Sequence, residues 1–231
     1  MAGKVLKQSA GYCTLLIALL LSAARCEEEP YASQFLTFIL PANILPSDSI
    51  AFIGDTLWIT ADVSDSLLEF NTNKKYLLPN FDFGQTSIVI RKLVNAQLGL
   101  SDQVSAASKF DLIEDIGEIT FPGETFIDFK YAYDFISKKY LLRIGIIPKE
   151  QGIFCFNFLR PDRLDYRGFV DLGKNSNGAS IIPIYEDLVV PVNDGENNFE
   201  LFKKNCLDQS EGPPENYRSN YRFVTFTFKV L

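Results

Sequence analysis

Apolar residues recur at every second position over several stretches of this 231-residue chain. From Phe126 to Phe135 the odd positions are apolar or aromatic, while the even positions include Asp128, Lys130 and Asp134. Successive side chains of a β-strand point to opposite faces, so this pattern is typical of a strand with one buried face and one wet face. Further strands are expected at 35–40, 56–63, 87–93, 140–147, 153–159 and 224–230.

Three of these stretches, 126–135, 140–147 and 153–159, follow one another closely and are expected to form an antiparallel meander. Pro148 and Gly152 bracket the last connection. Proline early and glycine late in a short connection are typical of a hairpin turn. The whole chain is therefore predicted to be all-β.

Residues 34–231 are expected to form a single domain, an antiparallel β-sandwich of immunoglobulin-like or jelly-roll-like type with one short helix. Some 200 residues suffice for one sandwich with long loops. Turn-forming residues predict those loops at 79–85, 160–178 and 209–220.

Two cysteines are expected to brace this domain. Cys155 lies opposite the phenylalanine face of its strand, and the helix predicted at Asn198–Cys206 places Phe199, Phe202 and Cys206 on one face. That helix could cover the outer face of the sheet and bring Cys206 to Cys155. A disulfide between Cys155 and Cys206 is the prediction for an exported chain, and two separate buried thiols are the alternative.

The N-terminal segment 1–25 has the layout of a secretory signal peptide. Lys4 and Lys7 precede a short apolar run at 13–21, and small residues follow at 22–24. The run is shorter than the roughly 20 apolar residues that cross a bilayer. The mature chain is therefore expected to be exported.

Two cleavage sites are open. Cleavage after Ala24 would release a soluble chain that begins at Arg25. Alternatively, the segment ending in Cys26 resembles a bacterial lipoprotein signal, although Arg25 stands where that family has a small residue. The resemblance implies lipidation of Cys26 and a tether over residues 26–33. The acidic run 27–29 resembles the surface-export signal of Bacteroidetes-type lipoproteins.

Two stretches carry a resemblance to a fold family. Residues 54–64 resemble an early strand of bacterial extracellular immunoglobulin-like sandwiches, and 140–159 resemble a later strand pair. The whole chain is most similar to the β-rich lipoproteins of Bacteroidetes-type bacteria. This resemblance implies a lipid-anchored protein of the cell envelope, at the outer membrane or cell surface. A periplasmic or secreted soluble protein is the alternative.

Composition excludes several functions. The chain has no histidine, which removes histidine-based triads and metal sites. Its net charge of −7 argues against nucleic acid as a partner. An acidic chain also disfavours attachment to anionic membranes through charge, so the membrane partner is expected to be reached through lipid. No motif for a cofactor is present, and none is predicted.

Pairs of carboxylates are the candidate catalytic groups. Glycoside hydrolysis uses two acids on either side of the scissile bond. Glu114 and Asp115 with Glu118, or Glu186 with Asp187, offer such pairs. Because acidic pairs are common in any acidic chain, solvated surface positions are the expected role.

Two polar loops and one tryptophan are weaker candidates. Loops 171–178 and 193–198 have a composition that suits calcium but lack the EF-hand spacing, so connecting loops are expected. Trp58 could stack on a sugar, but its place within a strand favours core packing. The turn 160–163 is expected to be solvated.

The sequence therefore predicts a non-catalytic, exported binding or structural module. A rigid sandwich would present loops to a glycan or to an envelope protein. A carboxylate-based glycan hydrolase and a subunit of an envelope complex are the alternatives.

Overall fold

The structure is a computed structural model that describes residues 31–159, 169–207 and 221–231. The predicted signal peptide 1–25, Cys26, most of the tether, the turn 160–163 and most of the loop 209–220 lie outside the described residues. The chain divides into two compact units. The smaller contains residues 31–33 and 172–182, and the larger contains the other described residues.

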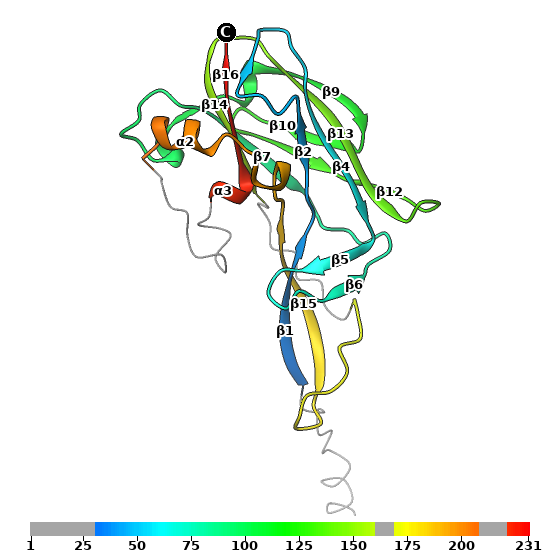
Figure 1. Cartoon of the computed structure of the whole chain (residues 1–231). Helices are drawn as coiled ribbons and strands as arrows, with labels where there is room; N and C mark the ends of the chain where they lie inside the picture. Colours follow the sequence, from blue (N-terminus) through cyan, green and yellow to red (C-terminus); the bar gives the residue numbers. More distant parts are fainter. Residues whose placement is uncertain (1–30, 160–168, 208–220) are drawn as a thin grey trace, which may run out of the picture. The chain divides into compact units, whose positions relative to one another are not determined.

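The chain is dominated by strands (Figure 1). The strands are β1 (Tyr31–Ile39), β2 (Asn43–Leu45), β3 (Ile50–Ala51), β4 (Leu57–Ser64), β5 (Ser66–Glu69), β6 (Lys75–Leu77), β7 (Thr86–Lys92), β8 (Val104–Ser105), β9 (Phe110–Ile116), β10 (Glu118–Pro122), β11 (Phe126–Lys130), β12 (Ala132–Asp134), β13 (Lys139–Pro148), β14 (Gly152–Leu159), β15 (Ser180–Val189) and β16 (Thr225–Val230). The helices are α2 (Phe199–Asn205) and α3 (Tyr221–Val224), with short 3-10 turns η1 (Leu100–Asp102), η2 (Ala107–Lys109) and η3 (Asn193–Gly195).

The larger unit is a β-sandwich, as the sequence predicts. A seven-stranded sheet runs in the order β10-β11-β7-β14-β16-β3, with β8 beside β7, and a five-stranded sheet runs β12-β13-β4-β2, with β9 beside β13. Phe110 of β9 packs between the sheets, with its ring centroid 5.0 Å from that of Phe154 and 5.8 Å from that of Phe156. The core therefore lies between the two inner faces, where aromatic rings interlock.

The predicted meander is wrong. β13 and β14 follow each other through a tight connection, but β13 pairs with β4 and β9 while β14 pairs with β7 and β16. The connection therefore crosses from one sheet to the other. The buried residues of β13 and the phenylalanines of β14 face each other across the core, and alternation alone is equally compatible with that arrangement and with a hairpin.

The stretch 126–135 is also not one strand. β11 pairs with β7 in the seven-stranded sheet, and β12 pairs with β13 in the five-stranded sheet. The chain changes sheet at Tyr131, which lies between them. Phe135, expected on the buried face, comes after the end of β12 and is 71% exposed.

A third sheet has the order β15-β1-β5-β6, and the carboxylate of Glu69 closes the turn after β5. It accepts hydrogen bonds from the backbone amides of Thr37, Asn71 and Thr72 and from the Thr72 hydroxyl. Burial alone would raise the pKa of Glu69, but these hydrogen bonds outweigh it and hold the pKa below its ordinary value.

The loop predicted at 171–178 lies in the smaller unit from Leu172 onward and is a connecting loop, as expected. The side-chain oxygen of Asn175 accepts hydrogen bonds from the amides of Asn177 and Ala179, at 2.9 and 3.0 Å. An asparagine that bonds its own following backbone is typical of a tight turn.

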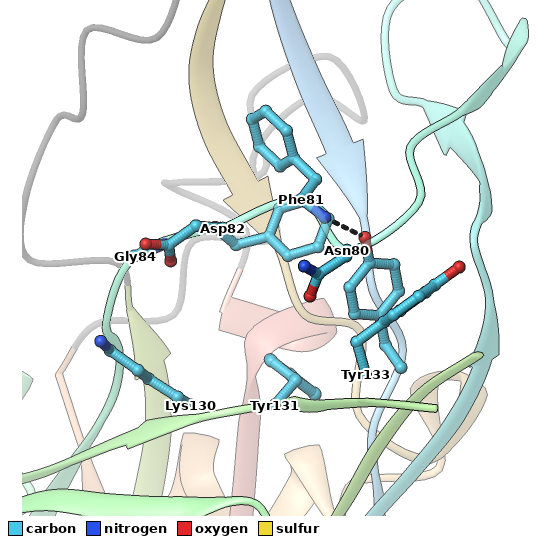
Figure 2. A pocket seen from close by; sticks show the side chains of 9 residues that line it. Asn80, Phe81, Asp82, Gly84, Lys130, Tyr131 and Tyr133 are labelled. Atoms are coloured by element: carbon cyan, nitrogen blue, oxygen red, sulfur yellow. Dashed lines mark hydrogen bonds between the residues drawn. The ribbon is translucent and has the colours of Figure 1, made fainter. Parts of the chain in front are cut away.

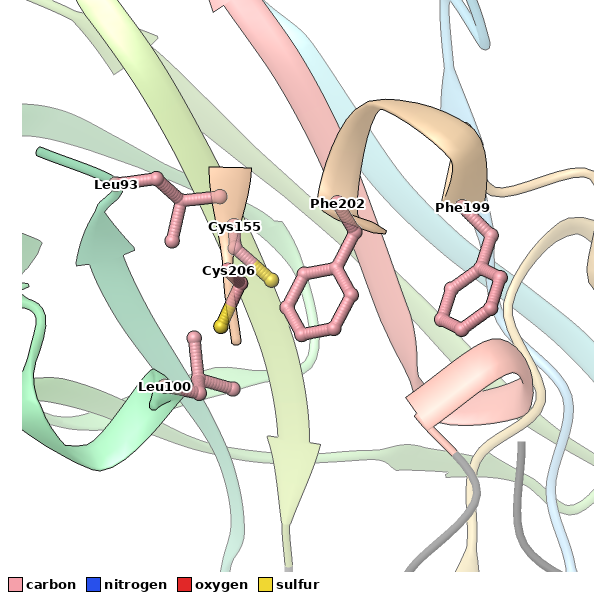
Figure 3. Close-up of a cluster of buried hydrophobic side chains, with 6 residues drawn as sticks. All are labelled: Leu93, Leu100, Cys155, Phe199, Phe202 and Cys206. Carbon is pink, nitrogen blue, oxygen red and sulfur yellow. The ribbon is translucent and has the colours of Figure 1, made fainter. Parts of the chain in front are cut away.

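The predicted helix and the face of Cys155 are confirmed. Helix α2 buries Phe199 and Phe202, and these rings form one cluster with Cys155 and Cys206 (Figure 3). The two cysteines therefore meet in a shared apolar environment outside the main core. Burial is the main cause that raises the pKa of Cys155 to about 12.

The predicted disulfide is not formed in the structure, where both cysteines are thiols. Each sulfur is directed at a different backbone oxygen. Cys155 Sγ lies 3.6 Å from the carbonyl oxygen of Phe156, and Cys206 Sγ lies 3.6 Å from that of Leu98. The pair thus packs as two small hydrophobic side chains with weak S–H donors.

Candidate functional site

A cleft of about 300 Å³ opens in the larger unit between the loop before β7 and the chain between β11 and β13 (Figure 2). Aromatic side chains dominate its walls, with a few polar groups among them. The lining residues are Asn80, Phe81, Asp82, Phe83, Gly84, Lys130, Tyr131, Tyr133 and Tyr140.

The cleft lies where the chain changes sheet. Lys130 is the last residue of β11 in the seven-stranded sheet, and Tyr133 belongs to β12 in the five-stranded sheet. Because β11 and β12 belong to different sheets, no single strand continues through this stretch, and no neighbouring strand pairs with the chain at the crossing. The crossing therefore leaves Lys130, Tyr131 and Tyr133 available as one wall.

The opposite wall is a loop that the hydroxyl of Tyr140 holds in place. This hydroxyl accepts a hydrogen bond from the amide of Phe81 at 2.7 Å and donates one to the carbonyl of Leu78. Tyr140 belongs to β13 and is only 2% exposed. Burial raises the pKa of Tyr140, so the hydroxyl stays protonated and keeps both bonds.

Two further contacts fix the same loop. The hydroxyl of Tyr185 donates to the carbonyl of Phe83 at 3.3 Å, and the carboxylate of Asp82 accepts from the amide of Gly84 at 2.8 Å. Behind the cleft, the ring of Phe81 packs 5.0 Å from Phe83 and 5.2 Å from Tyr185, measured between centroids. Side-chain and backbone bonds together make this loop a rigid wall.

The tyrosines of the β11–β12 wall differ in their hydrogen bonding. Tyr133 donates its hydroxyl to the carboxylate of Asp65 at 2.7 Å. Desolvation, then this bond to Asp65, raises the pKa of Tyr133 to about 12. The hydroxyl of Tyr131 is buried, and it has no hydrogen-bond partner among the described residues. A buried hydroxyl without a partner is unfavourable.

The polar groups of the cleft are an amide, a carboxylate and an ammonium, supplied by Asn80, Asp82 and Lys130. Aromatic walls with a few polar groups are the usual composition of a small-molecule binding site.

Within the described ranges, no group of three or more acidic or cysteine side chains is placed to hold a metal ion. In the same part of the chain, no helix has the length and apolar character needed to cross a membrane.

The predicted carboxylate pairs lie outside the cleft, and three of their members make contacts within the fold. Glu114 accepts a hydrogen bond from the amide of Ile119 at 2.7 Å, and Asp115 forms an ion pair with Arg143. Asp187 accepts from the amide of Leu188 at 2.8 Å. Glu118 is exposed at the start of β10.

The expected core position of Trp58 is wrong. Leu57 and Ile59 of β4 face the core, which leaves the alternate residue Trp58 on the outer face, half-buried. The guanidinium of Arg143 lies 4.1 Å from the centroid of a Trp58 ring, in a cation–π contact. Arginine therefore already occupies the ring face that a sugar would need.

The second polar loop, 193–198, connects elements as expected. The side-chain oxygen of Asn193 accepts from the amide of Ile44 at 2.6 Å and so ties η3 to β2.

Sequence reasoning missed the cleft itself. The segment 80–84 was expected only as a loop, and Tyr131 and Tyr133 only as part of a buried strand face. One signal was available, because two phenylalanines within the polar loop Asn-Phe-Asp-Phe-Gly are unusual for a solvated connection.

No family model matches the chain, and no curated protein matches it. Among solved structures, the human F-spondin reeler domain is similar over 70% of this chain and 89% of that domain, with 6% identity and a TM-score of 0.29. The type II cohesin dyad from the adaptor ScaA scaffoldin of Acetivibrio cellulolyticus is similar over 68% of this chain and 46% of the dyad, with 9% identity and a TM-score of 0.26. Likenesses at these TM-scores carry no conclusion about function.

We expect Tyr140→Phe to lower the free energy of unfolding by about 1–3 kcal/mol, because the Phe81 amide and the Leu78 carbonyl lose their shared partner. Urea unfolding monitored by circular dichroism measures the change. Tyr76→Phe is the matched control, since the Tyr76 hydroxyl makes no hydrogen bond to the described residues. Equal loss of stability in both variants would contradict the role assigned to the Tyr140 hydroxyl.

Proposed function

We propose that the chain is a non-catalytic binding module that holds a glycan in the aromatic cleft. The observation that carries this proposal is the combination of rings and hydrogen-bonding groups along the two walls. Such a module acts through the shape and chemistry of a preformed site, and here the loop wall is fixed by Tyr140 and Tyr185.

The chemistry of a sugar suits these walls. A pyranose ring has apolar C–H faces and a rim of hydroxyl groups. Tyr131 and Tyr133 supply aromatic surface for the C–H faces, while Asp82 accepts and Lys130 donates hydrogen bonds to hydroxyls.

The presence of a single carboxylate among the residues that line the cleft favours binding over hydrolysis. A glycosidase needs two carboxyl groups about 5–10 Å apart across the bond. Among the described residues that line the cleft, Asp82 supplies the only carboxylate. The neighbouring Asp65 accepts the Tyr133 hydroxyl and does not line the cleft. A glycan hydrolase is the alternative, and cleavage of a bound glycan would reveal it.

Glycan binding is tested by a glycan array followed by calorimetry with the best ligand. We expect Asp82→Asn and Lys130→Ala each to weaken binding about tenfold, the usual effect of losing a charged hydrogen bond. Asp111→Asn and Lys149→Ala are matched controls. These two residues form an exposed ion pair with 2.9 Å between Nζ and Oδ1, and neither of them lines the cleft.

Three results would contradict the proposal: an array without any bound glycan, equal effects of the cleft and control variants, or release of reducing sugar from a bound glycan. The last result would support the hydrolase instead.

We further propose that the chain is exported and anchored to the cell envelope by lipid on Cys26. The support is the sequence around this residue: a short apolar segment ends before it, and the acidic run 27–29 follows. β1 begins at Tyr31, so a short tether would separate the anchor from the folded chain. Release after Ala24 as a soluble exported protein is the alternative.

The intact mass of the protein purified from its native membrane tests this anchor. We expect a chain that begins at Cys26 and carries a diacylglyceryl group and an acyl group. A chain that begins at Arg25 without lipid would contradict the anchor and leave the glycan proposal unaffected.

A further inference from the structure

The turn between β12 and β13 presents two large apolar side chains to solvent. Phe135 is 71% exposed and Ile136 is 95% exposed. In the part of the chain that the structure describes, no other large hydrophobic side chain is as exposed as Ile136. Large apolar side chains side by side on a convex turn are unfavourable in water unless another apolar phase covers them.

The turn is rigid, so this exposure is a fixed property of the fold. The carboxylate of Asp134 accepts hydrogen bonds from the Ile136 amide at 2.9 Å and from the Ser137 hydroxyl at 2.6 Å. The amide of Lys138 donates to the carbonyl of Asp134 at 2.8 Å, and Lys138 adopts a left-handed backbone with φ of 56°. These bonds fix the turn that presents the two apolar side chains to solvent.

The base of the turn is attached to the folded core. The ring of Tyr133 packs edge-on against that of Phe135, with centroids 4.9 Å apart. On the other side, the amide of Asp65 donates to the carbonyl of Lys138 at 3.0 Å. The turn therefore projects from a fixed platform.

The charged groups around the turn are of both signs. Asp62 is paired with Lys139 at 2.7 Å, Asp65 accepts the Tyr133 hydroxyl, and Asp134 bonds within the turn. Lys138 is exposed and makes no ion pair within the described ranges. The ion pair cancels the charge of Asp62 only, because hydrogen bonds from hydroxyl and amide groups do not neutralise Asp65 and Asp134, and the Lys138 ammonium lies beside the apolar tip.

We infer that the turn Phe135–Lys138 inserts into the interfacial region of a lipid bilayer. Two side chains are too few for a stable protein interface, which needs about 1,000 Å² of buried surface. A bilayer needs no complementary groove, and it stabilises each apolar side chain that enters it. The Lys138 ammonium then lies at the level of the headgroup phosphates, as lysine side chains at membrane interfaces do.

This contact requires neither a bound glycan nor lipid on Cys26, although Phe135 packs against Tyr133 of the cleft wall. Beside a lipid anchor it would act as a second attachment, and it would hold the folded chain against the membrane surface. Binding that depends on one or two apolar groups is weak and reversible, so a second attachment is physically useful.

Vesicle sedimentation tests the inference with the mature chain, residues 26–231, made without its signal peptide and without lipid. We expect it to bind phosphatidylcholine vesicles, with little change when salt is added, because apolar burial provides the affinity. Phe135→Ser with Ile136→Ser should reduce partitioning by about tenfold or more for each side chain. Phe52→Ser is the matched control, since Phe52 is 57% exposed on another connection.

Fluorescence gives a second readout that does not depend on loss of binding. Trp58 is the only tryptophan, so Ile136→Trp in a Trp58→Phe background reports on the turn alone. We expect its emission to shift to shorter wavelength with vesicles. Any of three results would overturn the inference: no vesicle binding by the unaltered chain, equal loss with Phe52→Ser, or an emission spectrum that vesicles leave unchanged. Capture of a protein by the turn without vesicle binding would overturn it as well.

Discussion

The hydroxyl of Tyr140 is the interaction on which the proposed site depends. It links β13, a strand of the five-stranded sheet, to two backbone groups of the loop that forms one wall of the cleft. Tyr140 is itself held by the packing of its ring against Phe83 and Tyr133, at 5.0 and 5.1 Å between centroids. The geometry of the cleft is therefore an extension of core packing, and a ligand would meet a wall already ordered.

The change of sheet at Tyr131 is the second constraint. One alternating stretch supplies β11 to the seven-stranded sheet and β12 to the five-stranded sheet, and the cleft opens between them. Beyond β12 the chain turns sharply at Phe135, which leaves that ring exposed. A single crossing thus produces both the wall of the proposed glycan site and the apolar turn proposed to meet a bilayer.

Periodicity in the sequence predicted β4, β7, β11, β13, β14 and β16, the helix at 198–206 and the outer face of Cys155, because burial alternates with the geometry of each element. It missed β9, β10 and β15. It could not predict which strands pair, since alternation defines faces and not neighbours. The assumed meander and the continuous strand to Phe135 failed for that reason. Trp58 was predicted in the core because it is apolar. Its position next to Leu57 in an alternating strand instead places it on the outer face. The cleft was missed because its loop is ordered by Tyr140 and Tyr185, which are 59 and 102 residues away from their loop partners.

The most direct test of this account is amide hydrogen exchange of the loop 78–84, followed by nuclear magnetic resonance in the free protein and in Tyr140→Phe. If the Tyr140 hydroxyl holds the loop, the Phe81 amide is protected in the free protein, and its protection falls in the variant while the amides of β14 are unchanged. A Phe81 amide that exchanges as fast as an exposed loop in the unaltered protein would contradict a preformed cleft wall.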